Sequence, residues 1–150
     1  MIKNDRYNNK ILFELKNNGR IANTELAEKI GLSPSACLRR VQELENSGLI
    51  KGYRAVINNE LLGNNFIAYV SIGLGEHSIA SQLAFEKAIK LSEEVKECHN
   101  VTGSFEYLLR VETRDVKAFK HFHADILGAI TQISSITTHI VMDSPKDERK

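Results

Sequence analysis

The first fifty residues contain three short segments in which apolar positions recur at helical spacing. The first segment begins at Asn4 or Asp5, either of which can cap a helix, and ends at Asn18 and Gly19. The second runs from an expected Asn23 cap to a glycine at position 31, whose left-handed backbone would end it. The predicted inward faces of these two helices are Ile11, Leu12 and Leu15, followed by Leu26, Ala27 and Ile30.

The third segment carries a strong helix start signal. Ser33 fits the N-cap, and Pro34 fits the first turn, where its missing N–H costs nothing. Leu32 can pack on Cys37 as a hydrophobic staple, and the helix should end before Gly48. The predicted buried stripe is Cys37, Leu38, Val41 and Leu44.

The residues after this helix change from helical to alternating spacing. In "LIKGYRAVI", Tyr53, Ala55 and Ile57 alternate with polar or small residues, which predicts a strand or wing. Asn58 and Asn59 then resemble a linker. We therefore expect one domain over residues 1–60 and a second over residues 61–150.

The second domain is predicted to contain four strands and two helices. Strands are expected over 66–74, 95–102, 105–113 and 133–142, with helices capped by Ser78 and Asp115. The resulting β-α-β-β-α-β order is the ferredoxin-like α+β unit, in which both helices cover one sheet face. The predicted inward residues are Ala68, Val70, Ile72 and Leu74 in the first strand, Leu83, Phe85, Ala88, Ile89 and Leu91 in the first helix, and Val116, Phe119, Phe122, Ile126 and Leu127 in the second.

Apolar residues in these strands are numerous enough to suggest that both sheet faces are apolar. Such a second face would need a partner, so we expect a homodimer that packs through the sheet. The residues that support this expectation are Val70, Ile72, Leu109, Val111, Ile140 and Met142.

Composition narrows the class of protein. No apolar run is long enough to span a membrane, and "MIKNDRYNNK" lacks the apolar core of a secretory signal, so we expect a cytoplasmic protein. Residues 1–60 hold ten Lys and Arg against seven Asp and Glu, a net +3, which leaves ten against twelve, a net −2, for the rest. Cys37 and Cys98 are too far apart in sequence for a CxxC motif and are expected to be buried thiols.

The three-residue turn between the second and third helices is typical of a helix-turn-helix, whose last helix enters the major groove of DNA. With the buried stripe inward, Arg39, Arg40 and Glu43 should lie outward, and arginine can donate two hydrogen bonds to guanine. A phosphate could bind at the start of the second helix. The predicted DNA-contacting residues are Asn23, Ser33, Ser35, Ala36, Arg39, Arg40, Lys51 and Arg54. The alternative is a packing module in which Arg39 and Glu43 form a surface ion pair.

Metal and catalytic chemistry have little support. His121 and His123 would point about 200° apart on a helix and cannot chelate one ion together. The chain has no GxSxG, no phosphate loop and no cysteine partnered by histidine and carboxylate. We therefore expect no metal, no cofactor and no enzymatic activity.

Two stretches, "LSPSACLRRVQELENSGLIKGY" and "ECHNVTGSFEYLLRVETRD", followed by "ITTHIVM", resemble the feast/famine or Lrp/AsnC family of transcription regulators. The resemblance implies an N-terminal winged helix-turn-helix domain and a C-terminal ferredoxin-like (RAM) domain. It also implies dimers that often assemble into octamers, double-stranded DNA and an amino-acid effector as partners, and association with the nucleoid.

The same resemblance implies where the effector binds. The loop that matches the family's Gly-Asp-Phe/Tyr-Asp-Tyr stretch, together with two positions of the last strand, would lie where dimers meet. These residues are Gly103, Ser104, Phe105, Glu106, Tyr107, Ile136 and Thr138. Backbone N–H groups beside Gly103 can bind a carboxylate, and Glu106 or a backbone carbonyl can bind an ammonium group.

Two departures from the family pattern leave the effector open. Position 104 is Ser where the family often has Asp, and position 136 is Ile where Thr is frequent. These changes favour an apolar amino acid such as leucine, isoleucine or methionine, or no effector at all. The alternatives are therefore an architectural DNA-binding protein of the same family, a plain hairpin turn at "GSFEY" with Phe105 in the core, and, less favoured, a dimeric ferredoxin-like enzyme.

Overall fold

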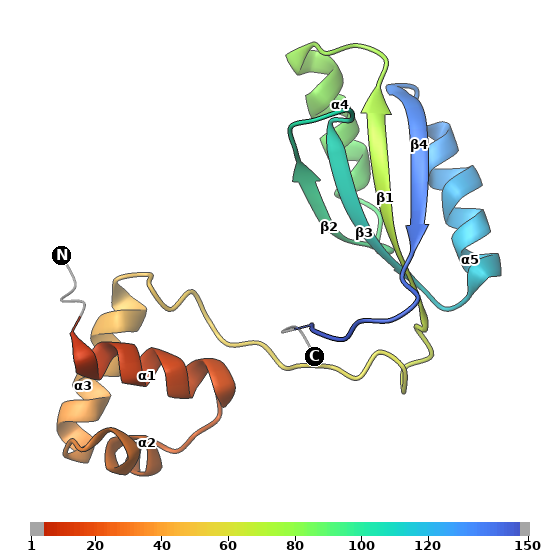
Figure 1. The fold of residues 1–150 in the computed structure, drawn as a ribbon. Coiled ribbons are helices and arrows are strands. Elements are labelled where there is room, and N and C mark those ends of the chain that lie inside the picture. Colours follow the sequence, from red (N-terminus) through yellow and green to blue (C-terminus); the bar gives the residue numbers. More distant parts are fainter. Residues whose placement is uncertain (1–4, 148–150) are drawn as a thin grey trace. The chain divides into compact units, whose positions relative to one another are not determined.

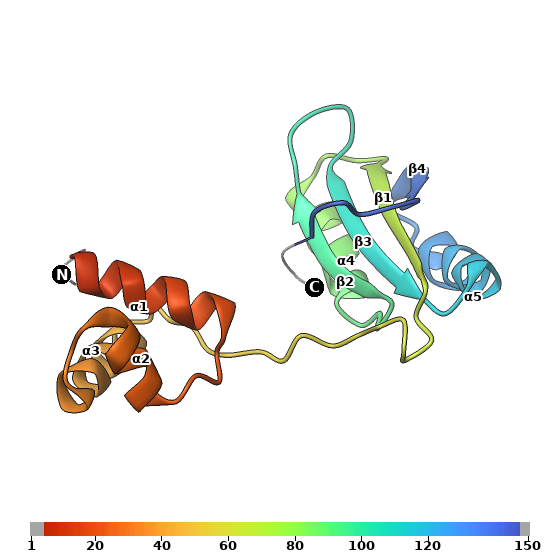
Figure 2. The ribbon, with the colours of Figure 1, turned by 60° about the horizontal axis from the view of Figure 1, so that its bottom comes forward.

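The computed structural model describes residues 5–147 and contains two compact units, one ending at Val56 and the other beginning at Ile57 (Figure 1). Three helices form the first unit: α1 (Arg6–Asn17), α2 (Asn23–Ile30) and α3 (Pro34–Asn46) (Figure 2). Six residues make its buried core, namely Ile11, Leu26, Ala27, Ile30, Cys37 and Leu44. Leu32 is partly buried against the same cluster as Cys37, as the predicted staple requires.

The helix caps follow the sequence closely, with one exception. Asp5 accepts a hydrogen bond from the Asn8 N–H at 2.9 Å, and the Ser33 hydroxyl caps α3. Gly31 ends α2 with φ 78°, in the left-handed region that glycine tolerates best. The exception is α2, which is capped by Ala22 without a side-chain bond, so the predicted Asn23 cap is wrong. The alternative first cap, Asn4, lies outside the described residues.

Two further predictions for this unit are wrong. Leu38 is exposed, because the inward positions of α3 are 37, 41 and 44 and residue 38 lies beside that stripe. Residues 51–58 form no strand, since no second strand lies beside them within the described unit to accept their hydrogen bonds. Tyr53 instead anchors this segment, with its hydroxyl donating to Glu45 at 2.8 Å.

The second unit has the predicted β-α-β-β-α-β order. Its elements are β1 (Phe66–Leu74), α4 (Ile79–Ile89), β2 (Val95–Asn100), β3 (Tyr107–Thr113), α5 (Val116–His121), a π-helical turn (Phe122–Ile126), a 3₁₀ turn (Leu127–Ala129) and β4 (Ile133–Ile140). The strands are antiparallel in the order β2-β3-β1-β4. Ser78 and Asp115 cap the helices as predicted, at 3.1 Å and 2.7 Å. In Figures 1 and 2, α4 lies against the β2–β3 side of the sheet and α5 against the β4 side.

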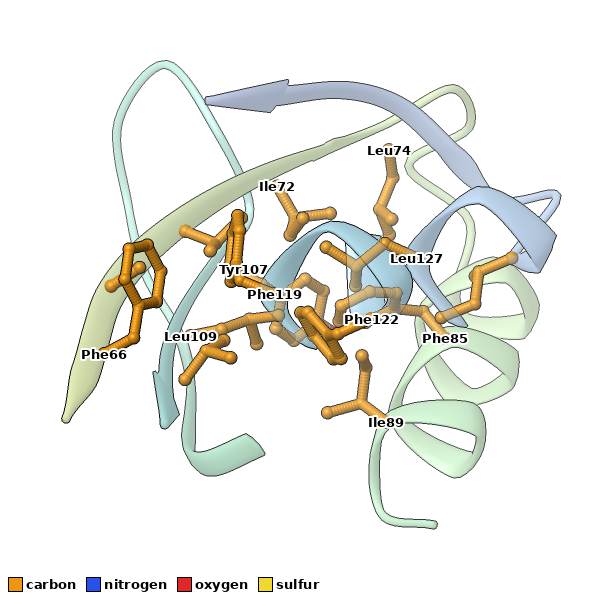
Figure 3. Close-up of a cluster of buried hydrophobic side chains, with 14 residues drawn as sticks. Phe66, Ile72, Leu74, Phe85, Ile89, Tyr107, Leu109, Phe119, Phe122 and Leu127 are labelled. Atoms are coloured by element: carbon orange, nitrogen blue, oxygen red, sulfur yellow. The ribbon is translucent and has the colours of Figure 1, made fainter. Parts of the chain in front are cut away.

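The core of this unit lies between the sheet and its two helices (Figure 3). Phe85 is fully buried, and its ring centroid lies 4.6 Å from that of Tyr107. Leu83, Leu91 and Val116 were predicted to point inward and are exposed instead. Leu83 lies about 200° around the helix from Phe85, and Leu91 follows the end of α4.

The helix-free face of the sheet mixes apolar and polar side chains, since Ile67 and Leu108 share it with Arg110 and Glu112. The apolar residues of β1 and β3 that were predicted to form the dimer interface do not lie on it. Val70, Ile72, Leu109 and Val111 all face the helices and are completely buried within one chain. Strand alternation places the neighbouring residues on the other face, where Arg110 and Glu112 form a buried ion pair. The remaining two apolar candidates, Ile140 and Met142, are exposed at and beyond the end of edge strand β4.

Several other properties concern the described residues only. Within residues 5–147, no helix is long and apolar enough to cross a membrane, and no group of three or more His, Cys, Asp or Glu could hold a metal ion. Cys37 is buried as expected, whereas Cys98 is exposed because it lies on β2, an edge strand.

The contrast between Phe85 and Leu83 tests this packing. Phe85→Ala should lower the free energy of unfolding of the C-terminal unit by about 3–5 kcal/mol, because it leaves a cavity in a closed core. Leu83→Ala, on the same helix, should change it by less than about 0.5 kcal/mol because that side chain is exposed. Urea unfolding of both variants, followed by circular dichroism, measures the difference. Equal losses would contradict the described orientation of α4.

Candidate nucleic-acid interface and ligand loop

The start of α3 presents a small polar surface. Ser33 and Ser35 are exposed and their hydroxyl oxygens lie 3.3 Å apart, while Ala36 is partly buried beside them. One turn later, Arg39 has a side chain that is 75% exposed. Its only ion-pair partner among residues 5–147 is Glu43, at 3.9 Å and also exposed. A surface pair of this kind contributes little, so the Arg39 guanidinium can leave it for a stronger partner.

Arg40 does not share this outward position, so the prediction that it lies outward and contacts DNA is corrected. Its Nη1 donates to both carboxylate oxygens of Asp5, at 3.1 and 2.9 Å, and to the Asn8 side-chain oxygen at 2.9 Å. The guanidinium also lies 5.3 Å from the centre of the Tyr7 ring, within cation–π range. Arg40 therefore ties α3 to the first turn of α1. Its role is to fix the orientation of α3, and its guanidinium is not part of the exposed surface of that helix.

The N-terminus of α1 is consequently a small electrostatic network. The pKa of the Asp5 carboxyl is lowered, first by the hydrogen bond from the Asn8 backbone and then by the hydrogen bond from Arg40. Both partners stabilise the charged carboxylate over the neutral acid. The same carboxylate thus caps α1 and holds α3.

Asn23 performs a role that the sequence pattern did not indicate. Its side-chain amide donates to the Pro34 carbonyl at 2.9 Å, which links the start of α2 to the start of α3. Because Ala22 supplies no side-chain cap, the first N–H groups of α2 have no side-chain acceptor. Free helix N–H groups attract anions. An anion at the start of α2 would therefore lie near the start of α3, because Asn23 links the two helix starts.

The two basic residues predicted to contact the DNA backbone lie beyond α3. Lys51 and Arg54 are exposed within the segment that has no regular secondary structure. Tyr53, between them, is fixed by its bond to Glu45; burial and this carboxylate raise the pKa of the tyrosine to about 12. The side-chain anchor at Tyr53 therefore limits where the two cations can lie.

The loop from residue 101 to 106 joins β2 to β3. Gly103 has φ 138°, a conformation that side-chain-bearing residues rarely adopt, and both Gly103 and Ser104 are exposed. Phe105 is partly buried and is not part of the hydrophobic core, contrary to the hairpin alternative.

Glu106 is the best-connected residue of this loop. Its Oε2 accepts the Leu74 N–H at 2.7 Å, and its Oε1 lies 3.2 Å from His77 Nδ1. Its backbone N–H also donates to the Ile72 carbonyl at 3.0 Å. The carboxylate therefore fastens the loop to the end of β1, which competes with the predicted role of binding an ammonium group.

Tyr107 points away from the exposed part of the loop. It is almost fully buried beneath α4, and its hydroxyl donates to Glu86 Oε1 at 2.8 Å. Burial, together with Glu86, raises the pKa of Tyr107 to about 12. The predicted effector residues of the loop thus separate into an outer group, around Gly103, and an inner tyrosine.

The two predicted effector residues of β4 lie apart from the loop. Ile136 pairs with Ile72 and Thr138 with Val70, and β1 separates both from β3. Two strand spacings correspond to roughly 10 Å between Ile136 and Tyr107. One chain therefore does not bring the predicted effector residues together into a single pocket.

Both domains of the chain match known protein families. Residues 67–150 match the Lrp/AsnC ligand binding domain, and residues 4–51 match a winged helix-turn-helix DNA-binding domain. The chain belongs to the Lrp/AsnC family. It is 36% identical to the leucine-responsive regulatory protein of Escherichia coli K12, over 97% of this chain and 89% of that protein.

Solved structures of Lrp/AsnC regulators have the same fold. A transcriptional regulator of Neisseria meningitidis in complex with L-methionine superposes with a TM-score of 0.93 at 31% identity, over 97% of this chain and 94% of that one. Escherichia coli AsnC gives 0.88 at 28% identity, and the Mycobacterium tuberculosis feast or famine regulatory protein complexed with L-methionine gives 0.82 at 28% identity; both cover 97% of each chain. These relatives are regulators, so the chain is a DNA-binding transcriptional regulator with an amino-acid ligand-binding domain and not an enzyme.

The Asp5 network makes a pH-dependent prediction. A carboxyl whose pKa is lowered by folding stabilises the folded unit above about pH 4, and this stabilisation is lost as pH falls through the lowered pKa. Arg40→Ala should raise the pKa of Asp5 towards its usual value, so acid unfolding of the N-terminal unit should begin at a higher pH. NMR titration of the Asp5 carboxyl carbon and circular dichroism measure the two effects.

Arg39→Ala is the matched control, because Arg39 makes no contact with Asp5 in the structure. It should leave both the pKa of Asp5 and the acid transition unchanged. An unshifted Asp5 titration in Arg40→Ala would show that the ion pair between α1 and α3 does not form in solution.

Proposed function

We propose that α3 binds operator DNA in the major groove, with Arg39 and Ser35 at the base edges. The observation that carries this proposal is the contrast between two adjacent arginines. The Arg39 side chain is 75% exposed, whereas Arg40 is 24% exposed and bound to Asp5. An exposed guanidinium one turn into a recognition helix can donate two parallel hydrogen bonds to guanine.

The surrounding residues suit contacts to the DNA backbone. The uncapped N–H groups of α2, beside Asn23, favour a phosphate, and Ser33 can donate its hydroxyl proton to another. Ala36 leaves room for close approach to the groove. We assign Lys51 and Arg54 to more distant phosphates, and we propose residues 1–60 as the functional DNA-binding domain.

We infer that the regulator binds DNA as a homodimer that assembles further, to an octamer. A two-fold symmetric dimer would place two copies of α3 on half-sites about 10 base pairs apart. Since the helix-free sheet face carries Ile67 and Leu108 beside the Arg110–Glu112 pair, such an interface would combine apolar contact with hydrogen bonds and ion pairs. We also propose that the protein acts in the cytoplasm, on the nucleoid, because its proposed partner is DNA.

We further propose that residues 61–150 bind an amino-acid effector between protomers. The exposed Gly103 and Ser104 and the partly buried Phe105 lie on one side of β1, and Ile136 and Thr138 lie on the other side. A pocket built from both groups therefore needs a second chain. Two structurally similar regulators are complexed with L-methionine, which supports methionine, leucine or isoleucine as the effector class.

The competing possibility is an architectural DNA-binding protein without an effector. Two observations favour it: position 104 carries no carboxylate, and Glu106 is already bonded to Leu74 and His77. In that case the loop would only join β2 to β3.

DNA binding is tested most directly at Arg39. Arg39→Ala should weaken operator binding by about 1–3 kcal/mol, since a base contact is lost while the fold is retained. Arg114→Ala is the matched control, because Arg114 is also 75% exposed and also pairs with a nearby carboxylate, but lies in the other unit. Fluorescence anisotropy with an operator fragment measures both affinities.

The salt dependence of the same assay separates the two kinds of contact. Loss of a base contact should weaken specific binding far more than binding to random DNA, whereas loss of a phosphate contact weakens both and reduces the salt slope by about one. Unchanged operator affinity in Arg39→Ala would exclude Arg39 as a base reader.

The effector proposal is tested by calorimetric titration with L-methionine, L-leucine and L-isoleucine. We expect saturable binding of at least one, weakened by Gly103→Ala because alanine disfavours φ 138°. Gly63→Ala is the control, because Gly63 also has positive φ and open space around it but lies outside the loop. Absence of binding to the unmodified protein would favour the architectural alternative.

A further inference from the structure

A cavity of about 230 Å³ lies at the outer edge of the C-terminal unit, between α4 and the β2–β3 pair. Figure 1 shows α4 lying against this part of the sheet. Three elements supply its lining: Glu86, Ile89 and the C-cap residue Lys90 come from α4 and its end, Cys98 and Asn100 from β2, and Tyr107 from β3. The cavity belongs to a single chain and contains none of the exposed loop residues from Gly103 to Phe105.

The register of the edge strand accounts for this lining. Asn100 pairs with Tyr107, and Cys98 pairs with Leu109, so both side chains lie on the helix-covered face. Because β2 is an edge strand, no further strand closes that side, and Cys98 and Asn100 remain exposed. The volume is below that of drug-sized ligand sites and suits a small metabolite.

The charges at the cavity have an unusual arrangement. Glu86 and Lys90 lie four residues apart on α4, a spacing at which opposite charges normally pair. Within the described residues no ion pair joins them, because Glu86 Oε1 instead accepts the Tyr107 hydroxyl at 2.8 Å. One anion and one cation therefore border the same cavity without neutralising each other.

We propose that this cavity binds a small zwitterionic α-amino acid, with its carboxylate at Lys90 and its ammonium group at Glu86. The two side chains leave the chain about 6 Å apart along the helix axis, so a ligand that carries both charges can lie between them. The Asn100 amide supplies a further hydrogen bond, and Ile89 and the Tyr107 ring supply the apolar wall. The volume of about 230 Å³ admits an amino acid with a small side chain, such as that of glycine, alanine or serine.

The surroundings of Cys98 support this arrangement. Burial and Glu86 raise the pKa of its thiol, while Lys90 acts in the opposite direction. Both charged groups are therefore close enough to act on the sulfur. The reactivity of the Cys98 thiol should therefore change when a ligand occupies the cavity.

The site extends the proposed function and does not depend on the effector loop. Tyr107 connects the two regions, because its backbone begins β3 directly after the loop and its hydroxyl lies at the cavity through Glu86. A ligand at Glu86 would compete for, or strengthen, the hydrogen bond that fixes this tyrosine. Occupancy of the cavity can therefore influence the loop from within one chain.

Alkylation of Cys98 by iodoacetamide tests the proposal on the full-length protein. Cys37, completely buried, is the internal reference and should react only on unfolding. Glycine, L-alanine or L-serine should slow Cys98 alkylation, about tenfold at ten times the ligand Kd, because only about a tenth of the sites is then empty. Propionate and ethylamine, which each carry one of the two charges, should protect far less than L-alanine.

Three variants locate the protection. Glu86→Gln and Lys90→Gln should each abolish it, whereas Lys87→Gln, an exposed residue of the same helix that does not line the cavity, should retain it. Gly103→Ala should also retain it, because the loop is not part of the site. Lys90 is exposed, so its variant tests the proposal even where Glu86→Gln disturbs folding.

Two results would overturn the proposal. The first is unchanged Cys98 alkylation with all three amino acids, and the second is protection that survives in both Glu86→Gln and Lys90→Gln. Operator binding measured on the same samples separates this failure from that of the proposed function. Intact operator binding without protection would reject the cavity site and leave DNA recognition standing.

Discussion

Backbone pairing on both sides of β1 is the constraint on which the C-terminal unit depends. β1 pairs with β3 over Phe66 to Ile72 and with β4 over Ala68 to Leu74, so its register fixes three of the four strands at once. At Gly73 the backbone of β1 lies so close to the Ser135 hydroxyl of β4 that an added Cβ would clash with it. A slip of one residue would turn every helix-facing side chain of β1 to the helix-free face. The same register keeps the loop and the β4 effector candidates on opposite sides of the strand.

The N-terminal unit solves a different problem, which is to hold a recognition helix firmly while leaving its surface free. The three helices share a core of only six buried side chains, so packing alone offers limited orientation. Arg40 adds a polar clamp from α3 to Asp5, and Asn23 adds a second one from α2 to the backbone of Pro34. With these contacts inside the unit, Arg39 and Ser35 stay available for DNA. Family membership and this geometry both indicate a DNA-binding regulator. The geometry also distinguishes the exposed Arg39 from Arg40, which is bound to Asp5.

Much of the architecture follows from the sequence through local rules. Caps at Asp5, Ser33, Ser78 and Asp115 bond to amides three residues away, and the apolar period of two or three to four residues marks strands and helices. The sequence-based predictions were wrong where a local pattern fits both a buried and an exposed position. Leu83 has the residue type of a core position, yet α4 turns it outward, and residues 51–58 alternate like a strand but have no partner strand.

The sequence by itself determined the element order, the helix-turn-helix and the family to which the chain belongs, because those features depend on residue types at fixed short spacing. Only the tertiary structure decided which partners individual side chains contact. Arg40 meets Asp5 across 35 residues and Tyr107 meets Glu86 across 21, and no local period encodes such contacts. The mixed character of the helix-free face likewise emerged only once strand register showed that Val70, Ile72, Leu109 and Val111 all face the helices. Long-range hydrogen bonds and register are properties of the folded chain, and here they decide which arginine is exposed and which side chains line the cavity beside α4.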